Sequence, residues 1–397
     1  MKSKKGEGIK ILKYISERAN EISYPKIREI FDRAAKFQDV INLGIGDPDF
    51  DTDSTIIDRT FKLIKEKKST HYTPVPGYQE LREAIALKYR EENKFEVNYE
   101  EIIVTHGAQQ ALMVAMFTLL NPGDEVLILD PYYPSYPSQI FLTGAIPVFI
   151  PTFEKNGFKV KRENIEKNIT KKTKLLILNT PNNPTGAILE KEDLRAISKI
   201  AIKNDLIVTS DEAYETMVYD NKKHFCIANF TGMKERTITI NSFSKRYAMT
   251  GWRIGYAVAT KEIIRNMMKI SGNNLSCPCS VSQQAAIVAL KSSAAIIKRM
   301  GLEYEKRRNF VVAELNKIKG ISCTKPEGAF YVFANIKETG RSSEQIYDEL
   351  LMKGRVVVIP GSAFGKQGEG YIRIAYTLPI DKLKEALERM KRVIEKE

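Results

Sequence analysis

Short β-branched apolar runs alternate with amphipathic helical segments between residues 75 and 260, and this alternation most constrains what the chain can fold into. Runs that are apolar on both faces are typical of parallel strands buried between two layers of helices. The alternation therefore predicts an α/β unit with a mostly parallel sheet. The strands are expected at residues 102–105, 126–129, 175–178, 206–209 and 237–240, separated by helices such as 78–92 and 190–204.

A different pattern follows residue 280, where long helical segments precede three strand candidates at 328–333, 356–359 and 371–376. This order predicts a second unit of the α+β class. The chain ends in a segment whose apolar residues recur at helical spacing, which indicates a closing helix with one packing face. The residues of that face are Ile380, Leu383, Leu387, Met390 and Ile394.

The composition argues against several classes of protein. With 397 residues, of which 43% are hydrophobic, the chain is long enough for two domains. No apolar run reaches the ~20 residues of a membrane span, and lysines interrupt the N-terminal apolar segment, so we expect neither a membrane anchor nor a secretory signal. The net charge of +13 is spread over helices in which acids and bases alternate, which argues against nucleic-acid binding.

Cysteine and histidine usage points away from redox and metal chemistry. Four cysteines are few for this length, and Cys277 and Cys279 lack the spacing of a CxxC pair. We expect reduced thiols in a cytoplasmic protein. The histidines His71, His106 and His224 are too scattered to predict a metal site.

Residues that carry chemistry follow the predicted strands, whose carboxyl ends are where α/β sheets bind ligands. Gly107, Ala108 and Gln109 follow the first strand and open a helix. Free backbone N–H groups and the helix dipole at such a start suit a phosphate. Ser242 and Arg253 add a hydroxyl and a cation, and the five residues together predict a phosphate site.

Lys245 follows the last of these strands and has Ser242 and Ser244 beside it, with Arg253 eight positions further on. A lysine delivered to the edge of a buried sheet in this setting is typical of a Schiff-base lysine. A solvated surface lysine is the alternative when Lys245 is considered alone.

Asp211 is expected at the carboxyl end of the strand 206–209, where an unpaired carboxylate is costly and implies a cationic partner. A protonated pyridine nitrogen meets that need, since a pair about 3 Å apart at an effective dielectric of about 20 attracts by roughly 5 kcal/mol. An N-cap aspartate that only starts a helix is the alternative.

Three further positions complete the set. Asn183 lies in a proline-containing loop after the strand 175–178, and its side-chain amide can donate a hydrogen bond. Tyr133 follows the strand 126–129 and offers a ring that can stack on a planar cofactor. Arg373 interrupts an otherwise apolar strand, and a buried arginine needs a carboxylate such as that of a substrate.

Taken together, these residues resemble the class I and II aminotransferases, the pyridoxal-phosphate enzymes of fold type I, and most closely the aspartate and aromatic aminotransferases of bacteria and archaea. The resemblance extends from the stretch 44–50 to Arg373. It implies a large cofactor-binding domain, with a mostly parallel seven-stranded sheet between helices, and a smaller α+β domain. The expected divisions are 1–48 for an N-terminal arm and the first part of the small domain, 49–288 for the large domain, and 289–397 for the rest of the small domain.

The resemblance also implies how the cofactor, pyridoxal 5′-phosphate, is held. Lys245 would bind it as a Schiff base and then move the proton between substrate and cofactor. Asp211 would pair with the ring nitrogen, and Tyr133 would stack on the ring. Asn183 and Tyr214 would bond the ring hydroxyl.

Substrate binding and assembly follow from the same resemblance. Arg373 would bind the α-carboxylate of the substrate beside Asn183, with Gly46 lining the site. A homodimer with shared active sites is implied, because Tyr72 would reach the phosphate from the partner subunit. The phosphate would otherwise be held by Gly107, Ala108, Gln109, Ser242 and Arg253.

The implied reaction moves the amino group of an amino acid, aromatic or aspartate or a broader set, to 2-oxoglutarate by a ping-pong mechanism. Several aspartate-specific relatives have a lysine where this sequence has Gln109, and this departure favours an aromatic or broad donor. Alternatives are other donors (alanine, kynurenine or a diaminopimelate-like compound) and a C–S lyase on the same fold. A non-catalytic transcription regulator would need an added DNA-binding domain, for which residues 1–40 are too short.

Overall fold

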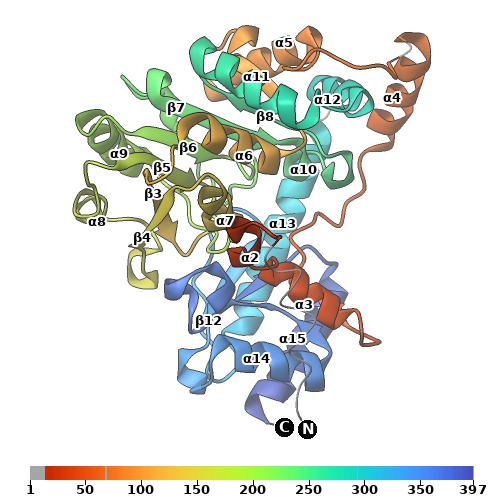
Figure 1. The fold of residues 1–397 in the computed structure, drawn as a ribbon. Coiled ribbons are helices and arrows are strands. Elements are labelled where there is room, and N and C mark those ends of the chain that lie inside the picture. Colours follow the sequence, from red (N-terminus) through yellow and green to blue (C-terminus); the bar gives the residue numbers. More distant parts are fainter. Residues whose placement is uncertain (1–13, 68, 293, 397) are drawn as a thin grey trace.

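The computed structural model describes residues 14–67, 69–292 and 294–396. Its largest element is a seven-stranded sheet in the order β2-β8-β7-β6-β5-β3-β4, with helices on both sides (Figure 1). The strands are β2 (Ile102–Thr105), β3 (Glu125–Asp130), β4 (Ile146–Pro151), β5 (Thr173–Asn179), β6 (Ile207–Asp211), β7 (Thr237–Ser242) and β8 (Gly255–Val258).

The expected mostly parallel sheet is confirmed. β3 to β7 pair in parallel, whereas β8 is antiparallel to both of its neighbours, β7 and β2. The sequence indicated neither β4 nor β8. β4 is an edge strand that contains Pro147 and Pro151, a place where proline is tolerated in a sheet. β8 is short and begins at Gly255, so its apolar run is too brief to stand out.

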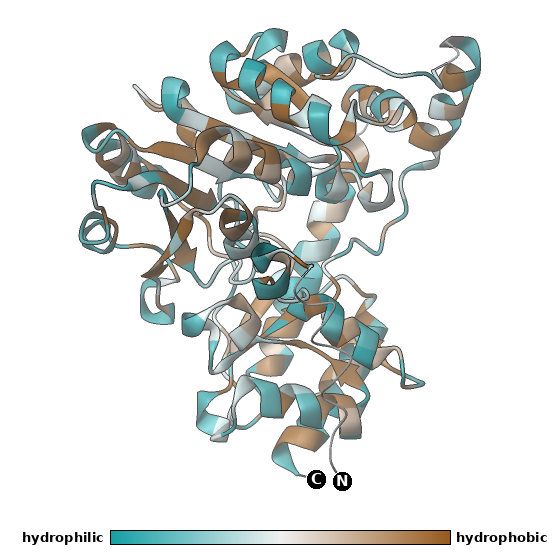
Figure 2. Cartoon of the chain, viewed as in Figure 1, coloured by the Kyte–Doolittle hydropathy of each residue, from teal (hydrophilic) through white to brown (hydrophobic). Residues whose placement is uncertain are grey.

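Both faces of this sheet are buried. Along β3, Val126 and Ile128 pack in one cluster with Leu112, while Leu127 packs in another with Leu194. The continuous apolar runs of the sequence therefore supply both faces. In Figure 2 the strands of the sheet are largely brown and the outer sides of the surrounding helices are largely teal. These helices are α4 (Ser54–Lys67), α5 (Gln79–Lys88), α6 (Ala108–Leu119), α7 (Ser135–Leu142), α8 (Arg162–Glu166), α9 (Lys191–Lys203), α10 (Phe243–Arg246), α11 (Lys261–Leu275) and α12 (Ser280–Ser292).

The C-terminal part is built on an antiparallel sheet in the order β11-β12-β9. The single strand expected at 356–359 is divided in the structure: β10 (Val356–Val357) pairs with β1 (Ile41–Asn42), whereas β11 (Ile359–Pro360) pairs with β12. A continuous apolar run cannot reveal this division, because both halves are buried. The other elements are β9 (Tyr331–Asn335), β12 (Tyr371–Ala375), α13 (Ala294–Leu315), α14 (Ser343–Glu349) and α15 (Ile380–Glu395).

The N-terminal residues pack with this C-terminal part. β1 pairs with β10, and Ile30 of α3 (Lys26–Ala34) belongs to the same core cluster as Leu383 and Leu387 of α15. The short helix α2 (Glu17–Glu21) precedes α3. Chain segments far apart in the sequence thus build one α+β unit (Figure 1).

The domain boundaries after residues 48 and 288 stay a prediction, and residues 1–13 of the predicted arm lie outside the described residues. Within the described ranges, no helix combines the length and the apolar character that crossing a membrane requires.

Candidate active site

Lys245 lies on α10, a short helix that directly follows β7. Ser242 caps this helix, because its hydroxyl accepts a hydrogen bond from the N–H of Ser244 at 3.0 Å. The cap satisfies an otherwise unpaired N–H and orients the turn that carries Lys245. Lys245 Nζ donates to the carbonyl of Gly46 at 2.5 Å, so two predicted site residues from distant parts of the chain are in contact.

The surroundings of Lys245 favour its neutral form. Burial lowers the pKa of the Lys245 amine to about 8, against the opposing charge of Asp47 and with help from Arg253 and Arg373. An unperturbed lysine has a pKa of about 10.4. Because only the neutral amine is a nucleophile or a base, this shift prepares Lys245 for chemistry near neutral pH.

Three predicted phosphate residues meet at the start of α6. Gly107 has φ +78°, a left-handed conformation that glycine adopts without strain. A Cβ at Gly107 would lie 2.7 Å from Nη2 of Arg253, so the guanidinium stands directly against this turn. Gly255 pairs with Ser242, and a Cβ on Gly255 would lie 2.7 Å from the carbonyl carbon of Gly107. We call Gly107, Ser242 and Arg253 the phosphate cradle, because its N–H groups, hydroxyl and cation suit a phosphate.

Asp211 ends β6 and is 6% exposed. Its Oδ2 accepts from the hydroxyl of Tyr136 at 2.8 Å, and its Oδ1 accepts from the N–H of Ala213 at 3.3 Å. Burial raises the pKa of Asp211 to about 6, and these two hydrogen bonds oppose the rise. Both donors are neutral, so a cation beside Asp211 would stabilise the carboxylate and be stabilised by it.

Arg373 lies on β12 and is 2% exposed. Its Nη1 donates to Oδ1 of Asn183 at 2.9 Å, and its Nη2 donates to the carbonyl of Gly44 at 2.7 Å. Its Cζ lies 4.4 Å from the ring centroid of Tyr331 and 4.9 Å from that of Phe364. Within the described residues, Nε is buried without a hydrogen-bond partner. Burial lowers the pKa of Arg373, and a carboxylate is the partner that would compensate its charge.

Two further pairs of tyrosines lie near the predicted site residues. The hydroxyls of Tyr214 and Tyr331 lie 2.9 Å apart. Tyr133 donates to Oε1 of Gln109 at 3.4 Å, and its ring meets that of Tyr136 edge to face, with centroids 5.5 Å apart. Tyr133 therefore contacts both Gln109 and Tyr136, the tyrosine that donates to Asp211.

Comparison with known proteins agrees with this geometry. The family described as aminotransferase class I and II matches residues 38–390. The chain belongs to this family. It is 45% identical to an aspartate aminotransferase of Pyrococcus abyssi, over 96% of this chain and 98% of the relative. It is 43% identical to aromatic-amino-acid aminotransferase 2 of Thermococcus litoralis, again over 96% and 98%.

Solved structures show the same relationship. The aromatic aminotransferase of Pyrococcus horikoshii matches with a TM-score of 0.88 at 45% identity, over 92% of this chain and 99% of that chain. An aspartate aminotransferase of Rhizobium meliloti matches with a TM-score of 0.92 at 36% identity, over 96% and 98%. This chain is therefore an amino acid aminotransferase with the α/β fold of pyridoxal-phosphate enzymes of fold type I.

Sequence reasoning did not single out three aromatic residues that contact predicted site residues, Tyr136, Phe330 and Tyr331. Lys245 Nζ lies 5.6 Å from the ring centroid of Phe330. Phe330 and Tyr331 belong to a run expected at 328–333 only as a strand, and no sequence pattern separates a ring that packs from a ring that faces a site. Tyr136 is preceded by Tyr132 and Tyr133, and that cluster was the one available signal.

Tyr72 is predicted to act across a subunit interface, and its role stays a prediction. Its side chain is 91% exposed in the single chain, so it has almost no packing partners there. The roles of the other site residues likewise stay predictions. The fold brings Lys245 into contact with Gly46, and it brings Arg253 against Gly107.

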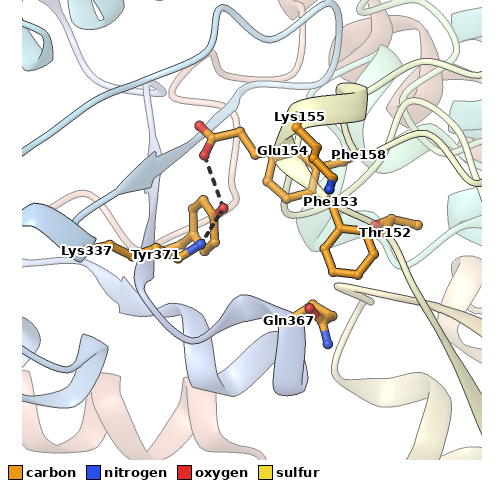
Figure 3. A pocket seen from close by; sticks show the side chains of 8 residues that line it. All are labelled: Thr152, Phe153, Glu154, Lys155, Phe158, Lys337, Gln367 and Tyr371. Carbon is orange, nitrogen blue, oxygen red and sulfur yellow. Dashed lines mark hydrogen bonds between the residues drawn. The ribbon is translucent and has the colours of Figure 1, made fainter.

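A separate pocket of about 330 Å³ lies where the segment after β4 meets the C-terminal sheet (Figure 3). Tyr371 donates to Oε2 of Glu154 at 3.1 Å and accepts from Nζ of Lys337 at 3.0 Å. None of the lining residues belongs to the predicted site: Thr152, Phe153, Glu154, Lys155, Phe158, Lys337, Gln367 and Tyr371.

Proposed function

We propose that this aminotransferase uses pyridoxal 5′-phosphate and moves the amino group of an aromatic amino acid or aspartate, or of a broader set of donors, to 2-oxoglutarate by a ping-pong mechanism. Lys245 carries the proposal, because it is a buried amine of lowered pKa that contacts Gly46 and lies within the electrostatic reach of Arg253 and Arg373. The relatives named for aspartate and for aromatic amino acids support both donor classes.

The residues present fit the cofactor at each of its polar groups. The cradle of Gly107, Ser242 and Arg253, with the N–H groups of Ala108 and Gln109, would hold the phosphate. Asp211, whose pKa is raised by burial, would hold the protonated ring nitrogen. The ring hydroxyl would face Asn183 and Tyr214, and the ring would stack on Tyr133. When bound, pyridoxal phosphate supplies an electron sink for the pair left on the substrate Cα.

The orientation of the Asn183 side-chain amide suits both the proposed cofactor and the proposed substrate-binding arginine. Its Oδ1 accepts from Arg373, which leaves its side-chain N–H₂ to donate. A donor there suits an anionic oxygen on the cofactor. The same side chain thereby connects the residues around the cofactor to the guanidinium that would bind the substrate.

Lys245 would hold and move the proton. As a neutral amine, Nζ accepts the proton from the substrate Cα, and as an ammonium it can return a proton. Arg373 would bind the α-carboxylate through a bidentate, charge-assisted pair and so present the Cα–H bond to Nζ. The buried setting of Arg373 strengthens this pair, because little water competes for the guanidinium.

Donor choice is tested by steady-state turnover of aspartate, tyrosine, phenylalanine, alanine and kynurenine with 2-oxoglutarate. Gln109 accepts from Tyr133 and carries no charge, which supports aromatic or broad use over a dicarboxylate preference. Negligible turnover of tyrosine and phenylalanine would remove the aromatic proposal. Release of ammonia and pyruvate without a second product amino acid would point instead to lyase chemistry. Sequential kinetics would contradict the ping-pong scheme.

We also propose a homodimer in which Tyr72 serves the site of the partner subunit. Its 91% exposure supports an interface at this position. Mixing Tyr72→Ala and Lys245→Ala subunits, followed by subunit exchange, tests it. With random pairing, half of the dimers are mixed and each has one intact site, so about a quarter of the wild-type activity should return. If Tyr72 served its own subunit instead, mixing would restore nothing.

A cytoplasmic location and the domain division after residues 48 and 288 complete the proposal. The cysteines Cys226, Cys277, Cys279 and Cys323 are all free, which suits a reducing compartment. One core cluster consists mostly of residues before 48 and after 288, with Tyr214, Met217, Tyr219 and Ala248 joining it from the large domain, and separate clusters cover the seven-stranded sheet. This arrangement supports the division.

A further inference from the structure

The segment that enters β9 places two aromatic rings in the site. Ala329 has φ +58°, a left-handed conformation that is uncommon for a residue with a Cβ. Its carbonyl accepts hydrogen bonds from the hydroxyls of Tyr219 at 2.5 Å and Tyr376 at 3.1 Å, and these bonds stabilise the turn. The next two rings, Phe330 and Tyr331, have centroids 4.8 Å apart. The first faces the catalytic lysine, and the second faces the substrate side.

Tyr331 touches three residues of the proposed site. It is 1% exposed, and its hydroxyl lies 2.9 Å from that of Tyr214. Its ring lies beneath the guanidinium of Arg373, 4.4 Å from Cζ to the centroid. A Cβ on Gly46 would lie 2.1 Å from the Tyr331 hydroxyl, so Gly46 leaves the space that this oxygen occupies. Tyr331, like Asn183, thus contacts both the proposed cofactor residues and the proposed substrate residues.

The direction of the hydroxyl pair follows from its chemistry. Burial raises the pKa of both tyrosines, Tyr214 and Tyr331, so both carry their protons at neutral pH. Only one of two protonated hydroxyls can donate to the other. When Tyr214 donates outward to a cofactor oxygen, it must accept from Tyr331. A donor that itself accepts a hydrogen bond is polarised and becomes a stronger donor.

The ring of Tyr331 has a second effect, on Arg373. A guanidinium stacked on an aromatic face is attracted by the ring quadrupole and is held in one plane. Phe364 also lies against Arg373, so two rings fix the fork that would receive a carboxylate. Removing one ring would let the guanidinium turn away from that position.

We propose that Tyr331 is a positioning residue with two separable effects: its hydroxyl strengthens Tyr214 as a donor to the cofactor, and its ring orients Arg373 toward the substrate carboxylate. This inference rests on the proposed function, because it assigns Tyr214 and Arg373 to the cofactor and the substrate. It predicts that the two effects respond to different substitutions at one position.

Tyr331→Phe removes only the hydroxyl. Negative charge on the ring oxygen of the cofactor is then less stabilised, so the pH midpoint of the change in the visible absorption band should rise by about half a unit to one unit. The KM of the amino donor should stay within about twofold, because the ring still supports Arg373. The measurements are a spectrophotometric pH titration of the holoenzyme and steady-state kinetics.

Tyr331→Leu removes the ring as well. The KM of the amino donor should rise by about tenfold beyond its value in Tyr331→Phe, with a smaller change in kcat, since the lost contact orients Arg373. Circular dichroism and thermal unfolding would show whether Tyr331→Leu folds. If it does not, Tyr331→Phe alone still decides the effect of the hydroxyl, and Tyr331→Trp, which keeps a stacking face, tests the ring by retaining a low KM.

Gly46→Ala gives an independent route to the same hydroxyl. The added methyl group would collide with it and should weaken cofactor binding by about tenfold, measured through quenching of the single tryptophan, Trp252, which neighbours Arg253. In the double variant Gly46→Ala/Tyr331→Phe, the colliding oxygen is gone, so much of the cofactor affinity should return. Additive losses would contradict the proposed contact.

Tyr371→Phe is the matched control. Tyr371 is a buried tyrosine on the neighbouring strand β12, and its hydroxyl is bonded to Glu154 and Lys337 on the rim of a different pocket (Figure 3). Tyr371→Phe likewise removes one buried tyrosine hydroxyl and its hydrogen bonds, but these go to Glu154 and Lys337 and not to Tyr214 or Arg373. The absorption midpoint and the KM should therefore match the wild type.

A wild-type midpoint in Tyr331→Phe together with a wild-type KM in Tyr331→Leu would overturn the proposal. An equal midpoint shift in Tyr371→Phe would overturn it too, by showing a general effect of lost hydroxyls. These failures differ from failure of the proposed function, in which the wild-type protein itself would take up no cofactor and show no visible band. In that case the proposed role of Tyr331 would be wrong as well.

Discussion

Two sets of buried charges lie next to each other in the sequence, and they are paired in opposite ways. Asp211 has neutral partners, and burial raises its pKa to about 6. Glu215, four residues on, receives Nζ of Lys88 at 2.5 Å and Nη1 of Arg246 at 3.3 Å. Burial alone would raise the pKa of Glu215, but the positive charges of Lys88 and Arg246 lower it to about 2. Lys245 and its neighbour Arg246 differ in the same way, because Lys245 donates to a neutral carbonyl whereas Arg246 donates to carboxylates.

The difference separates residues that await a ligand from residues that hold the protein together. In the proposed site, Asp211 and Arg373 are hydrogen-bonded to neutral groups, at a cost in stability, so that a cofactor or substrate of opposite charge would complete each pair. The adjacent set is complete without a ligand. Glu212, Glu215 and His224 place possible metal-ligand atoms within 4.8 Å of one another, but Lys88 already lies on Glu215 as its cation. The absence of a metal site stays a prediction.

Lys245→Ala should have the largest effect on the ligand-awaiting set. Loss of the proposed covalent anchor and base should lower kcat/KM by about 10⁴-fold or more and abolish the visible absorption band expected of the bound cofactor. Steady-state assays and a spectrum measure both. The exposed lysine substitution Lys62→Ala should change neither, and substantial residual turnover in Lys245→Ala would contradict the assignment.

Arg373→Ala should lower kcat/KM by about a thousandfold, mainly through KM, because a charge-assisted bidentate pair to the substrate is lost. Kinetics with an amino acid and with the corresponding amine that lacks the carboxylate would test this. If the variant discriminated between the two as strongly as the wild type does, Arg373 would not be the carboxylate partner.

Glu215→Gln addresses the paired set. It leaves the buried charge of Lys88 without this carboxylate, whereas Arg246 keeps its ion pair with Glu92, so the free energy of unfolding should fall by about 3 kcal/mol. Urea denaturation of the apoprotein measures the loss. The exposed pair of Lys261 and Glu100 provides the control, since solvent screens this pair and Glu100→Gln should cost much less than Glu215→Gln. Equal losses of unfolding free energy in the two variants would contradict the proposal that Glu215 stabilises the protein by pairing with buried cations.

The smallest effect is the pH dependence of stability, which has opposite signs for the two carboxylates. The raised pKa of Asp211 means that its stability contribution is present below about pH 4 and is lost as pH rises through about 6. Asp211→Asn apoprotein should therefore gain between about 1 and 3 kcal/mol at pH 7 and little at pH 4. The depressed pKa of Glu215 gives a contribution that is present above about pH 4.5 and lost as pH falls toward 2.

Urea titrations of both variants at several pH values would separate these contributions. The Asp211→Asn gain should appear on the neutral side, whereas the Glu215→Gln deficit should shrink on the acid side. A loss of stability in Asp211→Asn at pH 7 would show that the carboxylate already has a cationic partner in the apoprotein.

Much of the proposed site follows strand ends, and strand ends can be recognised from apolar runs. Gly107, Asp211, Ser242 and Lys245 were predicted as site residues in this way. Tyr136 and Tyr331 were not, since a tyrosine in an apolar segment gives no sign of which partner its hydroxyl will meet. The division of the run 356–359 between two sheets was missed for the same reason: hydrogen-bond partners are not local information.

The sequence by itself determined the α/β class, the mostly parallel sheet and the chemical identity of the residues at its edge, because periodicity and side-chain type are local properties. Only the tertiary structure decided which charges are paired. Lys88 and Glu215 are 127 residues apart, and Gly46 and Lys245 are 199 apart, yet each pair is in contact. Such distant contacts decide whether a buried charged group already has a partner or would gain one from a ligand. Burial shifts the pKa of each group in the direction that favours its neutral form, and a nearby opposite charge opposes that shift.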